Sequence, residues 1–129
     1  MDIQTKLPWV GTTIFSQMSQ LAQQTGAINL SQGFPDFSAD QRLLSAVNEH
    51  VLAGRNQYAP MIGVATLRQQ IADLTQNCYQ RTIDPELEVT VTSGATEALF
   101  VAIQAVVRPG DEVIVFDPAY DSYRPAVEL

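Results

Sequence analysis

Apolar residues recur every three or four positions in several stretches of the chain, with polar residues between them. This spacing places the apolar side chains on one face of an α-helix. Thr12 or Thr13 can cap the first stretch and Gly26 can end it, because a hydroxyl accepts first-turn N–H groups and glycine adopts the left-handed conformation. The pattern predicts helices from residue 12 or 13 to about 24, over 40–53 and 64–79, from about 96 to 107, and from about 120 onward.

Three shorter segments are rich in β-branched and other apolar residues, which is typical of strands. They span residues 27–31, 88–92 and 112–116. The second segment, the helix from about Thr96 and the third segment form a predicted βαβ unit, whose crossover is right-handed and whose strands are parallel. The expected fold class is therefore α/β. A parallel sheet buried on both faces needs more than three strands, so these residues supply only part of one.

The turn between the second predicted strand and its helix, from Ser93 to Thr96, is a candidate phosphate site. The first N–H groups of a helix lack intrahelical partners and carry the positive end of the helix dipole, so an anion against Ala95 and Thr96 is stabilised. Gly94 lets the backbone approach the anion closely. A glycine-containing turn between strand and helix is also common where nothing binds, and its shape alone leaves that alternative open.

The loop after the third predicted strand runs from Asp117 to Tyr120. If the two parallel strands are neighbours, this loop and the turn at Gly94 emerge at the same edge of the sheet, where ligands of open α/β sheets bind. A phosphate on the helix and a ring against Tyr120 would suit a flat phosphorylated heteroaromatic molecule. The residues by themselves favour the alternative, in which Tyr120 is an ordinary loop aromatic that covers the sheet edge.

Composition narrows the classes of partner. The 129 residues carry a net charge of −7, which argues against nucleic acid or an anionic membrane. No apolar run approaches the ~18 residues of a membrane span, and the Met1-Asp2 start lacks the features of a signal peptide. The single cysteine, Cys78, excludes an intramolecular disulfide and fits a reducing cytosol, so we expect a cytoplasmic protein. His50, the only histidine, has no metal-ligand partner at a suitable spacing, and no metal site is expected.

Four sequence motifs cover nearly the whole chain from about Phe15 onward. They are Ile28–Phe37, Asn56–Pro60 with Gly63–Arg68, Ser93–Ala98, and Pro109–Val113 with Asp117–Tyr123. In this order they resemble the N-terminal third of the class I/II aminotransferases, which are fold-type-I enzymes that use pyridoxal 5′-phosphate. Within that family the residues are most similar to the bacterial methionine aminotransferases and the related kynurenine/glutamine aminotransferases. Four motifs in order are far more specific than any one of them.

The resemblance implies a three-layer α/β/α large domain that is incomplete here, together with an N-terminal segment of a small domain. Residues 1–37 would be the arm, helix and strand of the small domain. Residues 38–129 would be the first part of the large domain, which binds the cofactor.

The resemblance also implies which residues bind the cofactor. The backbone N–H groups of Ala95 and Thr96, the Thr96 hydroxyl and the turn at Gly94 would hold the phosphate. Tyr120 would stack on the pyridine ring through its ring face. Tyr58 matches the tyrosine that reaches across a homodimer interface to the phosphate of the neighbouring subunit. Without the resemblance, Tyr58 fits a buried tyrosine with a satisfied hydroxyl.

Three further residues match substrate-binding positions. Gly33 matches the glycine whose backbone N–H meets the substrate carboxylate, and Phe34 follows it at the pocket wall. Phe15 matches an aromatic position that lines the pocket for the substrate side chain. The helical spacing of Phe15 with Met18 and Leu21 indicates plain core packing equally well.

The Schiff-base lysine of these enzymes, which also moves a proton between substrate and cofactor, has no counterpart in this chain. Lys6 is the only lysine and precedes every motif. The aspartate that pairs with the pyridinium nitrogen and the arginines that bind the phosphate and the substrate carboxylate belong to later segments of such enzymes. We therefore assign no catalytic residue, and we expect the isolated chain to be inactive.

The motifs favour an aminotransferase that moves an amino group from an amino acid, methionine or an aromatic one, to a 2-oxo acid. Two alternatives stay open at the level of the residues. One is a non-catalytic fragment or regulatory module of the same fold, and the other is a pyridoxal-phosphate-dependent β-lyase. The expected partners are the amino acid and oxo acid substrates and a second copy of the chain.

Overall fold

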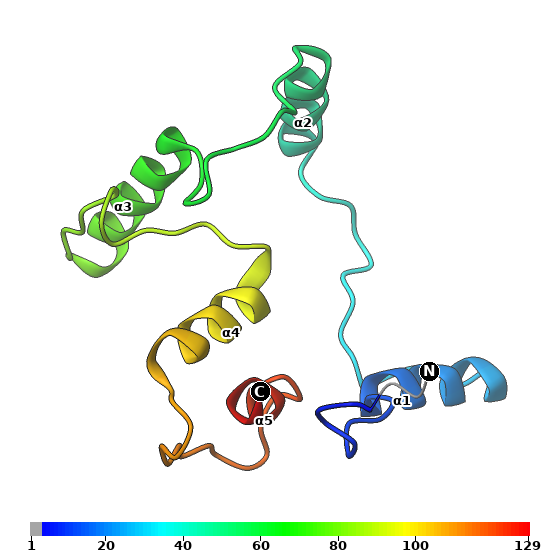
Figure 1. The fold of residues 1–129 in the computed structure, drawn as a ribbon. Coiled ribbons are helices and arrows are strands. Elements are labelled where there is room, and N and C mark those ends of the chain that lie inside the picture. Colours follow the sequence, from blue (N-terminus) through cyan, green and yellow to red (C-terminus); the bar gives the residue numbers. More distant parts are fainter. Residues whose placement is uncertain (1–3) are drawn as a thin grey trace. The chain divides into compact units, whose positions relative to one another are not determined.

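Residues 4–129 are described by the computed structural model, and within them the chain forms five α-helices and no β-strand (Figure 1). The helices are α1 (Ile14–Thr25), α2 (Gln41–Leu52), α3 (Ala65–Tyr79), α4 (Gly94–Val106) and α5 (Tyr123–Glu128). In this described part, no helix is both long enough and apolar enough to cross a bilayer. The Met1-Asp2 start lies outside the described residues.

Caps at both ends of α1 fix its limits. Thr13 precedes the helix in extended conformation, and its hydroxyl accepts the N–H of Ser16 at 3.3 Å. Gly26 follows the helix at φ 68°, and its N–H donates to the carbonyl of Ala22. A hydroxyl side chain is a favoured N-cap, and a glycine in the left-handed conformation is a favoured C-terminal cap. The first predicted helix is confirmed.

The next two predicted helices are confirmed as α2 and α3. Asp40 precedes α2, and its carboxylate accepts the N–H of Arg42 at 2.8 Å, which satisfies one first-turn donor. Gly54, at φ 72°, follows the end of α2. Gln80 ends α3 in the left-handed conformation at φ 54°, and its N–H donates to the carbonyl of Gln76.

The last two helices begin at different residues from those predicted. The first residue of α4 is Gly94, two positions earlier than expected, because Ser93 is the N-cap and its N–H donates to the carboxylate of Glu97. The first residue of α5 is Tyr123, whose N–H closes a turn by donating to the carbonyl of Tyr120 at 3.1 Å. Caps and turns decide helix ends locally, so shifts of this size are common.

The three predicted strands are not formed. Residues 27–31, 88–92 and 112–116 are all free of strand structure within the described chain. A strand exists through N–H···O=C bonds to a neighbour, and the two segments predicted to pair with each other belong to different units of the chain. Instead of a row of interstrand hydrogen bonds, the segment 88–92 has one backbone hydrogen bond to residues before α3, from the N–H of Val91 to the carbonyl of Ile62 at 3.1 Å. The strand predictions are therefore wrong for this structure.

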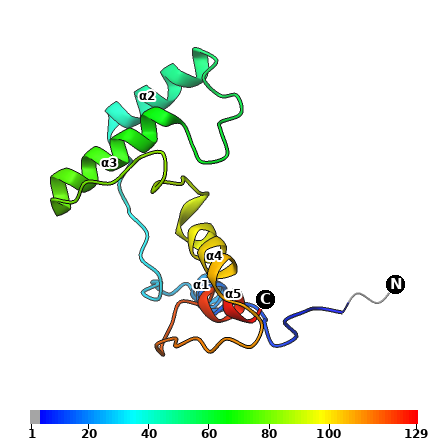
Figure 2. The same cartoon turned by 60° about the vertical axis from the view of Figure 1, so that its left-hand side comes forward.

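The chain divides into two compact units. The first comprises the described residues up to Glu49 together with Glu112–Leu129, and it contains α1 and α5. The second is His50–Asp111, with α3 and α4, and the division falls within α2. Inside the second unit, the chain turns back along α3 after the helix ends, as Figure 2 shows.

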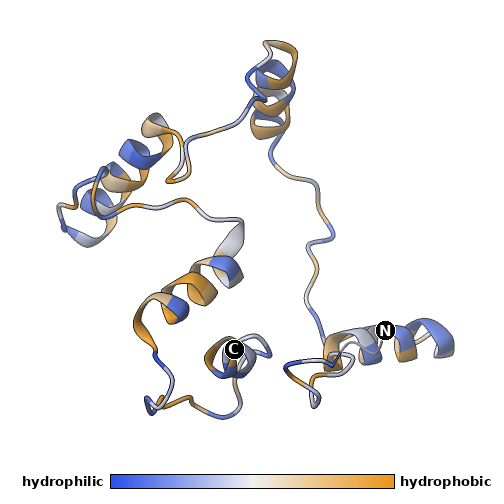
Figure 3. Cartoon of the chain, viewed as in Figure 1, coloured by the Kyte–Doolittle hydropathy of each residue, from blue (hydrophilic) through white to orange (hydrophobic). Residues whose placement is uncertain are grey.

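Few side chains are buried in either unit. Among the described residues, one charged and three hydrophobic residues are buried: Arg68, Ala72, Val89 and Ala126. Large apolar side chains on the predicted strands, such as Leu30 and Ile114, are each 90% exposed. Apolar residues also follow most of α4 (Figure 3). Contiguous apolar surface of this kind is typical of packing or interaction surfaces.

Candidate functional site

The first turn of α4 is an exposed helix N-terminus. Gly94 has φ 85°, a value that favours glycine, and a Cβ built on it would meet no atom within 4 Å. Ala95 and Thr96 follow, and both are exposed. First-turn N–H groups have no intrahelical acceptor and carry the positive end of the helix dipole. The turn therefore offers space and donors to an anion.

Hydrogen bonds around this turn fix which donors face outward. The N–H of Ser93 donates to the Glu97 carboxylate, and the N–H of Gly94 donates to the carbonyl of Thr92 at 2.8 Å. The Thr92 hydroxyl donates to the carbonyl of Gly94 at 3.0 Å. The N–H groups of Ala95 and Thr96 belong to the first turn of α4, where a helix N–H has no intrahelical acceptor, and both residues are exposed. Such a set fits a phosphate group, which accepts several hydrogen bonds at once.

In the first unit, the structure brings together Tyr120 and Phe15. Their ring centroids are 6.3 Å apart with an interplanar angle of 42°. Tyr123, the first residue of α5, adds an edge-on contact to Tyr120 at 5.9 Å. Aromatic pairs at these separations attract one another and restrict each other's rotation. A predicted substrate-pocket residue thus packs against the predicted cofactor-stacking residue, which the sequence did not indicate.

A second cluster in the first unit was missed by sequence reasoning. Trp9 donates its indole N–H to the Glu128 carboxylate at 2.7 Å, and Arg124 donates to the same carboxylate at 2.6 Å. The Arg124 guanidinium also lies 4.4 Å from the centroid of the Trp9 ring, a cation–π distance. The cluster ties the segment before α1 to α5, which follows the Tyr120 loop directly.

The Glu128 carboxylate makes this cluster sensitive to acid. The hydrogen bond from Arg124, and to a lesser extent that from Trp9, lowers the pKa of Glu128 below the usual value of a glutamate. Because the pKa of Glu128 is lowered, its contacts with Arg124 and Trp9 are fully present when the pH is above the ordinary pKa of a glutamate. They are lost as the pH falls through the lowered pKa of Glu128. Trp9 is the only tryptophan, so its fluorescence in the 129-residue chain is expected to change with a midpoint below the ordinary pKa of glutamate.

Two variants test this assignment. Glu128→Gln is expected to abolish the fluorescence transition, since the amide does not titrate. Asp40→Asn removes another carboxylate of lowered pKa, which pairs with Arg42, and it is expected to leave the transition unchanged. A midpoint at or above the ordinary glutamate value would contradict the assignment.

The other predicted site residues are exposed. Tyr58 lies between α2 and α3 with its side chain fully exposed, so the alternative of a buried tyrosine is wrong. Gly33 and Phe34 lie between α1 and α2, and both are exposed. The site residues divide between the units: Gly94, Ala95, Thr96 and Tyr58 in the second, and Tyr120, Gly33, Phe34 and Phe15 in the first. Their grouping around one ligand stays a prediction.

The remaining chemistry of the described residues is sparse. No three side chains among His, Cys, Asp and Glu gather as a metal-binding group within residues 4–129. Cys78 is a free, exposed thiol. Lys6 is exposed in the segment before α1. The exposed first turn of α4 and the contact of Tyr120 with Phe15 are the features on which the candidate site rests.

Comparison with known proteins identifies the family. The model of the family "Aminotransferase class I and II" matches residues 25–129. Methionine aminotransferase of Escherichia coli (strain K12) is 60% identical over 126 residues, which is 98% of this chain and 33% of that protein. The probable N-succinyldiaminopimelate aminotransferase DapC of Mycobacterium tuberculosis (strain H37Rv) is 46% identical over 118 residues, 92% of this chain and 30% of that protein.

A solved structure agrees with these matches. The crystal structure of YbdL from Escherichia coli, whose description identifies a methionine aminotransferase function, superimposes with a TM-score of 0.93 at 58% identity. The superposition covers 99% of this chain and 34% of the YbdL chain. The backbone conformation is thus that of the corresponding part of a fold-type-I aminotransferase, and the predicted fold class is confirmed even though no strand is formed here. The chain spans about a third of the length of the relatives it matches, and it belongs to the class I and II aminotransferases.

Proposed function

We propose that this chain supplies the phosphate-binding part of a pyridoxal-phosphate-dependent aminotransferase. The enzyme transfers an amino group from an amino acid, with methionine or an aromatic amino acid favoured, to a 2-oxo acid. The observation that carries the proposal is the exposed N-terminus of α4, where Gly94 leaves open space beside the N–H groups of Ala95 and Thr96. The 60% identity to a methionine aminotransferase supports the choice of amino donor.

Pyridoxal 5′-phosphate, when bound, supplies an electron sink that makes the substrate Cα–H acidic. The residues of this chain fix the positions of the cofactor and the substrate. The N-terminus of α4 anchors the phosphate through Ala95 and Thr96, and Tyr120 presents its ring face to the pyridine. Phe15, already packed on Tyr120, limits the rotation of that ring and lines the pocket for the substrate side chain. Fixing both partners before the reaction removes an entropic part of its barrier.

The remaining proposed contacts complete the substrate site. Gly33 offers its backbone N–H to the substrate carboxylate, and Phe34 forms part of the pocket wall. Tyr58 reaches the phosphate of the neighbouring subunit in a homodimer, and its full exposure makes its ring available to another chain. We assign residues 1–37 to the small domain and 38–129 to the large domain of a cytoplasmic enzyme.

A chimaera tests the proposal. These 129 residues replace the matching third of the Escherichia coli methionine aminotransferase, and we call the product the complete enzyme. We expect it to bind pyridoxal 5′-phosphate and to convert methionine to its 2-oxo acid in the presence of an oxo acid acceptor. If the complete enzyme is folded but binds no cofactor, the proposal is wrong.

The isolated chain gives the opposite expectation. With methionine, cofactor and an oxo acid it is expected to show no turnover, and with the cofactor alone it is expected to show no band near 420 nm, roughly that of a lysine-bound cofactor. Lys6 is the only lysine, and it lies outside the family motifs. Borohydride reduction followed by mass spectrometry checks the result, and a stoichiometric cofactor adduct on Lys6 would overturn the site assignment.

A further inference from the structure

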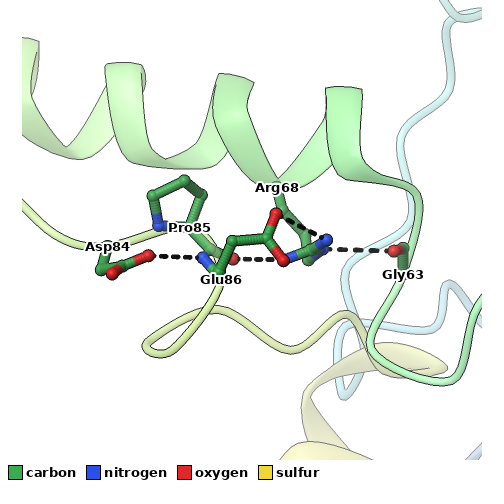
Figure 4. Close-up of polar contacts among 5 residues, drawn as sticks. All are labelled: Gly63, Arg68, Asp84, Pro85 and Glu86. Atoms are coloured by element: carbon green, nitrogen blue, oxygen red, sulfur yellow. Dashed lines mark hydrogen bonds and ion pairs between the residues drawn. The ribbon is translucent and has the colours of Figure 1, made fainter.

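Arg68 is a buried cation within the second unit, at 4% exposure. Its guanidinium donates to the carbonyl of Gly63 at 3.2 Å, to the carbonyl of Pro85 at 2.5 Å and to the carboxylate of Glu86 at 3.1 Å. Figure 4 shows the side chain lying between these partners. A buried charge is costly unless paired, and the planar five-donor guanidinium can satisfy three acceptors at once where an ammonium cannot match the geometry.

The three acceptors come from opposite ends of α3. Gly63 precedes the helix, whereas Pro85 and Glu86 follow it after the chain has turned back. The returning loop is itself held by two bonds: the N–H of Glu86 donates to the Asp84 carboxylate and the N–H of Asp84 donates to that of Glu88, each at 2.7 Å. Arg68 therefore fixes the segment before α3 against the segment after it.

This fixed segment leads directly to the first turn of α4. The carbonyl of Ile62 accepts the N–H of Val91 at 3.1 Å. The backbone of Gly63 lies so close to Val91 that a Cβ on residue 63 would be 2.5 Å from its Cγ2. Val91 is two residues before Ser93, the N-cap of α4. The contact between residues 62–63 and Val91 thus holds the chain two residues before the N-cap of α4, and Arg68 binds the carbonyl of residue 63.

We propose that Arg68 is a positioning residue for the cofactor phosphate: by binding Gly63, Pro85 and Glu86 together, it orients the turn that presents Ala95 and Thr96. The inference rests on the proposed function, because it concerns the same phosphate site. Arg68 does not touch the phosphate in this arrangement. It acts through Gly63 and Val91, so its loss alters the direction of the donors without removing any of them.

The test compares two ligands in the complete enzyme. Pyridoxal 5′-phosphate uses the α4 turn, and pyridoxal, which has no phosphate, does not. Arg68→Met is expected to raise the dissociation constant of pyridoxal 5′-phosphate about tenfold, the effect of losing one well-directed charged hydrogen bond. The constant for pyridoxal is expected to change by less than about twofold, since its ring contacts remain. The ³¹P resonance of the bound phosphate is expected to shift as its donors reorient.

Two further variants keep the test decisive. Arg68→Lys keeps the charge and can reach one acceptor, so it is expected to give an intermediate ratio of the two constants, and it replaces Arg68→Met if that protein does not fold. Arg81→Met removes an exposed arginine that pairs with Glu88 at 3.7 Å in the same unit, and it is expected to leave both constants unchanged.

The outcomes separate the inference from the proposed function. Equal loss of affinity for both ligands in the Arg68 variants would show a purely structural role and overturn the inference. An unchanged ratio in folded Arg68→Lys and Arg68→Met would overturn it as well. If the unsubstituted complete enzyme does not prefer pyridoxal 5′-phosphate to pyridoxal, the proposed function itself fails, and this inference fails with it.

Discussion

Replacing Gly63 by alanine is expected to lower the free energy of unfolding of the complete enzyme by about 3 kcal/mol. Two costs add. Gly63 has φ 99°, a conformation that costs an L-residue on the order of 1–3 kcal/mol. The new Cβ would also lie 2.5 Å from Cγ2 and 2.7 Å from Cβ of Val91, and overpacking of this kind costs roughly 1–3 kcal/mol. Urea unfolding followed by circular dichroism at fixed protein concentration measures the change.

Two other glycines separate these costs. Gly54 has φ 72° with no atom within 4 Å of a would-be Cβ, so Gly54→Ala is expected to cost only about 1 kcal/mol, the backbone part. Gly11 has neither a positive φ nor a close neighbour, and Gly11→Ala is expected to be neutral or stabilising by up to about 1 kcal/mol. Equal effects at positions 63 and 54 would show that the contact with Val91 contributes nothing.

The helices could be predicted because their determinants are local. Thr13 and Gly26 bracket α1 within the sequence itself, and both act as predicted. The strands failed because a strand is stabilised by residues far away in the chain. Residues 88–92 have the composition of a strand, yet Val91 finds only one backbone partner, the carbonyl of Ile62. The amino-acid types of these five residues do not determine which segment of the chain lies beside them.

The side-chain clusters around Glu128 and Arg68 could not be predicted for the same reason. Trp9 and Glu128 are 119 residues apart, and no periodicity links them. The acidic turn from Asp84 to Glu88 shows no partner at a near position in the sequence, because Glu86 pairs with Arg68 from 18 residues away. One signal was available: Arg68 lies four residues before Ala72, on the face of α3 that is buried. A charged residue on an apolar helix face needs acceptors, and the acidic turn supplies them.

Substitutions at the phosphate turn and at the stacking ring are expected to weaken cofactor binding to the complete enzyme in a definite order. Thr96→Val removes the proposed hydroxyl donor to the phosphate, and such a charge-assisted hydrogen bond is worth roughly 1.5–3 kcal/mol. Tyr120→Ala removes a ring face and is expected to cost about 1 kcal/mol or somewhat more. Tyr120→Phe keeps that face and the contact with Phe15, so the dissociation constant is expected to change little.

Equilibrium dialysis of pyridoxal 5′-phosphate against each variant measures the order, with Thr96→Ser as the matched control that keeps the hydroxyl. The Phe15 contact sharpens the expectation for position 120, because the two rings are 6.3 Å apart and alanine would leave Phe15 without its partner. Suppose that phenylalanine and alanine at position 120 proved equally harmful while valine at position 96 had no effect. The hydroxyl of Tyr120 would then be the group that binds, and the phosphate would not lie on the helix that begins at Gly94.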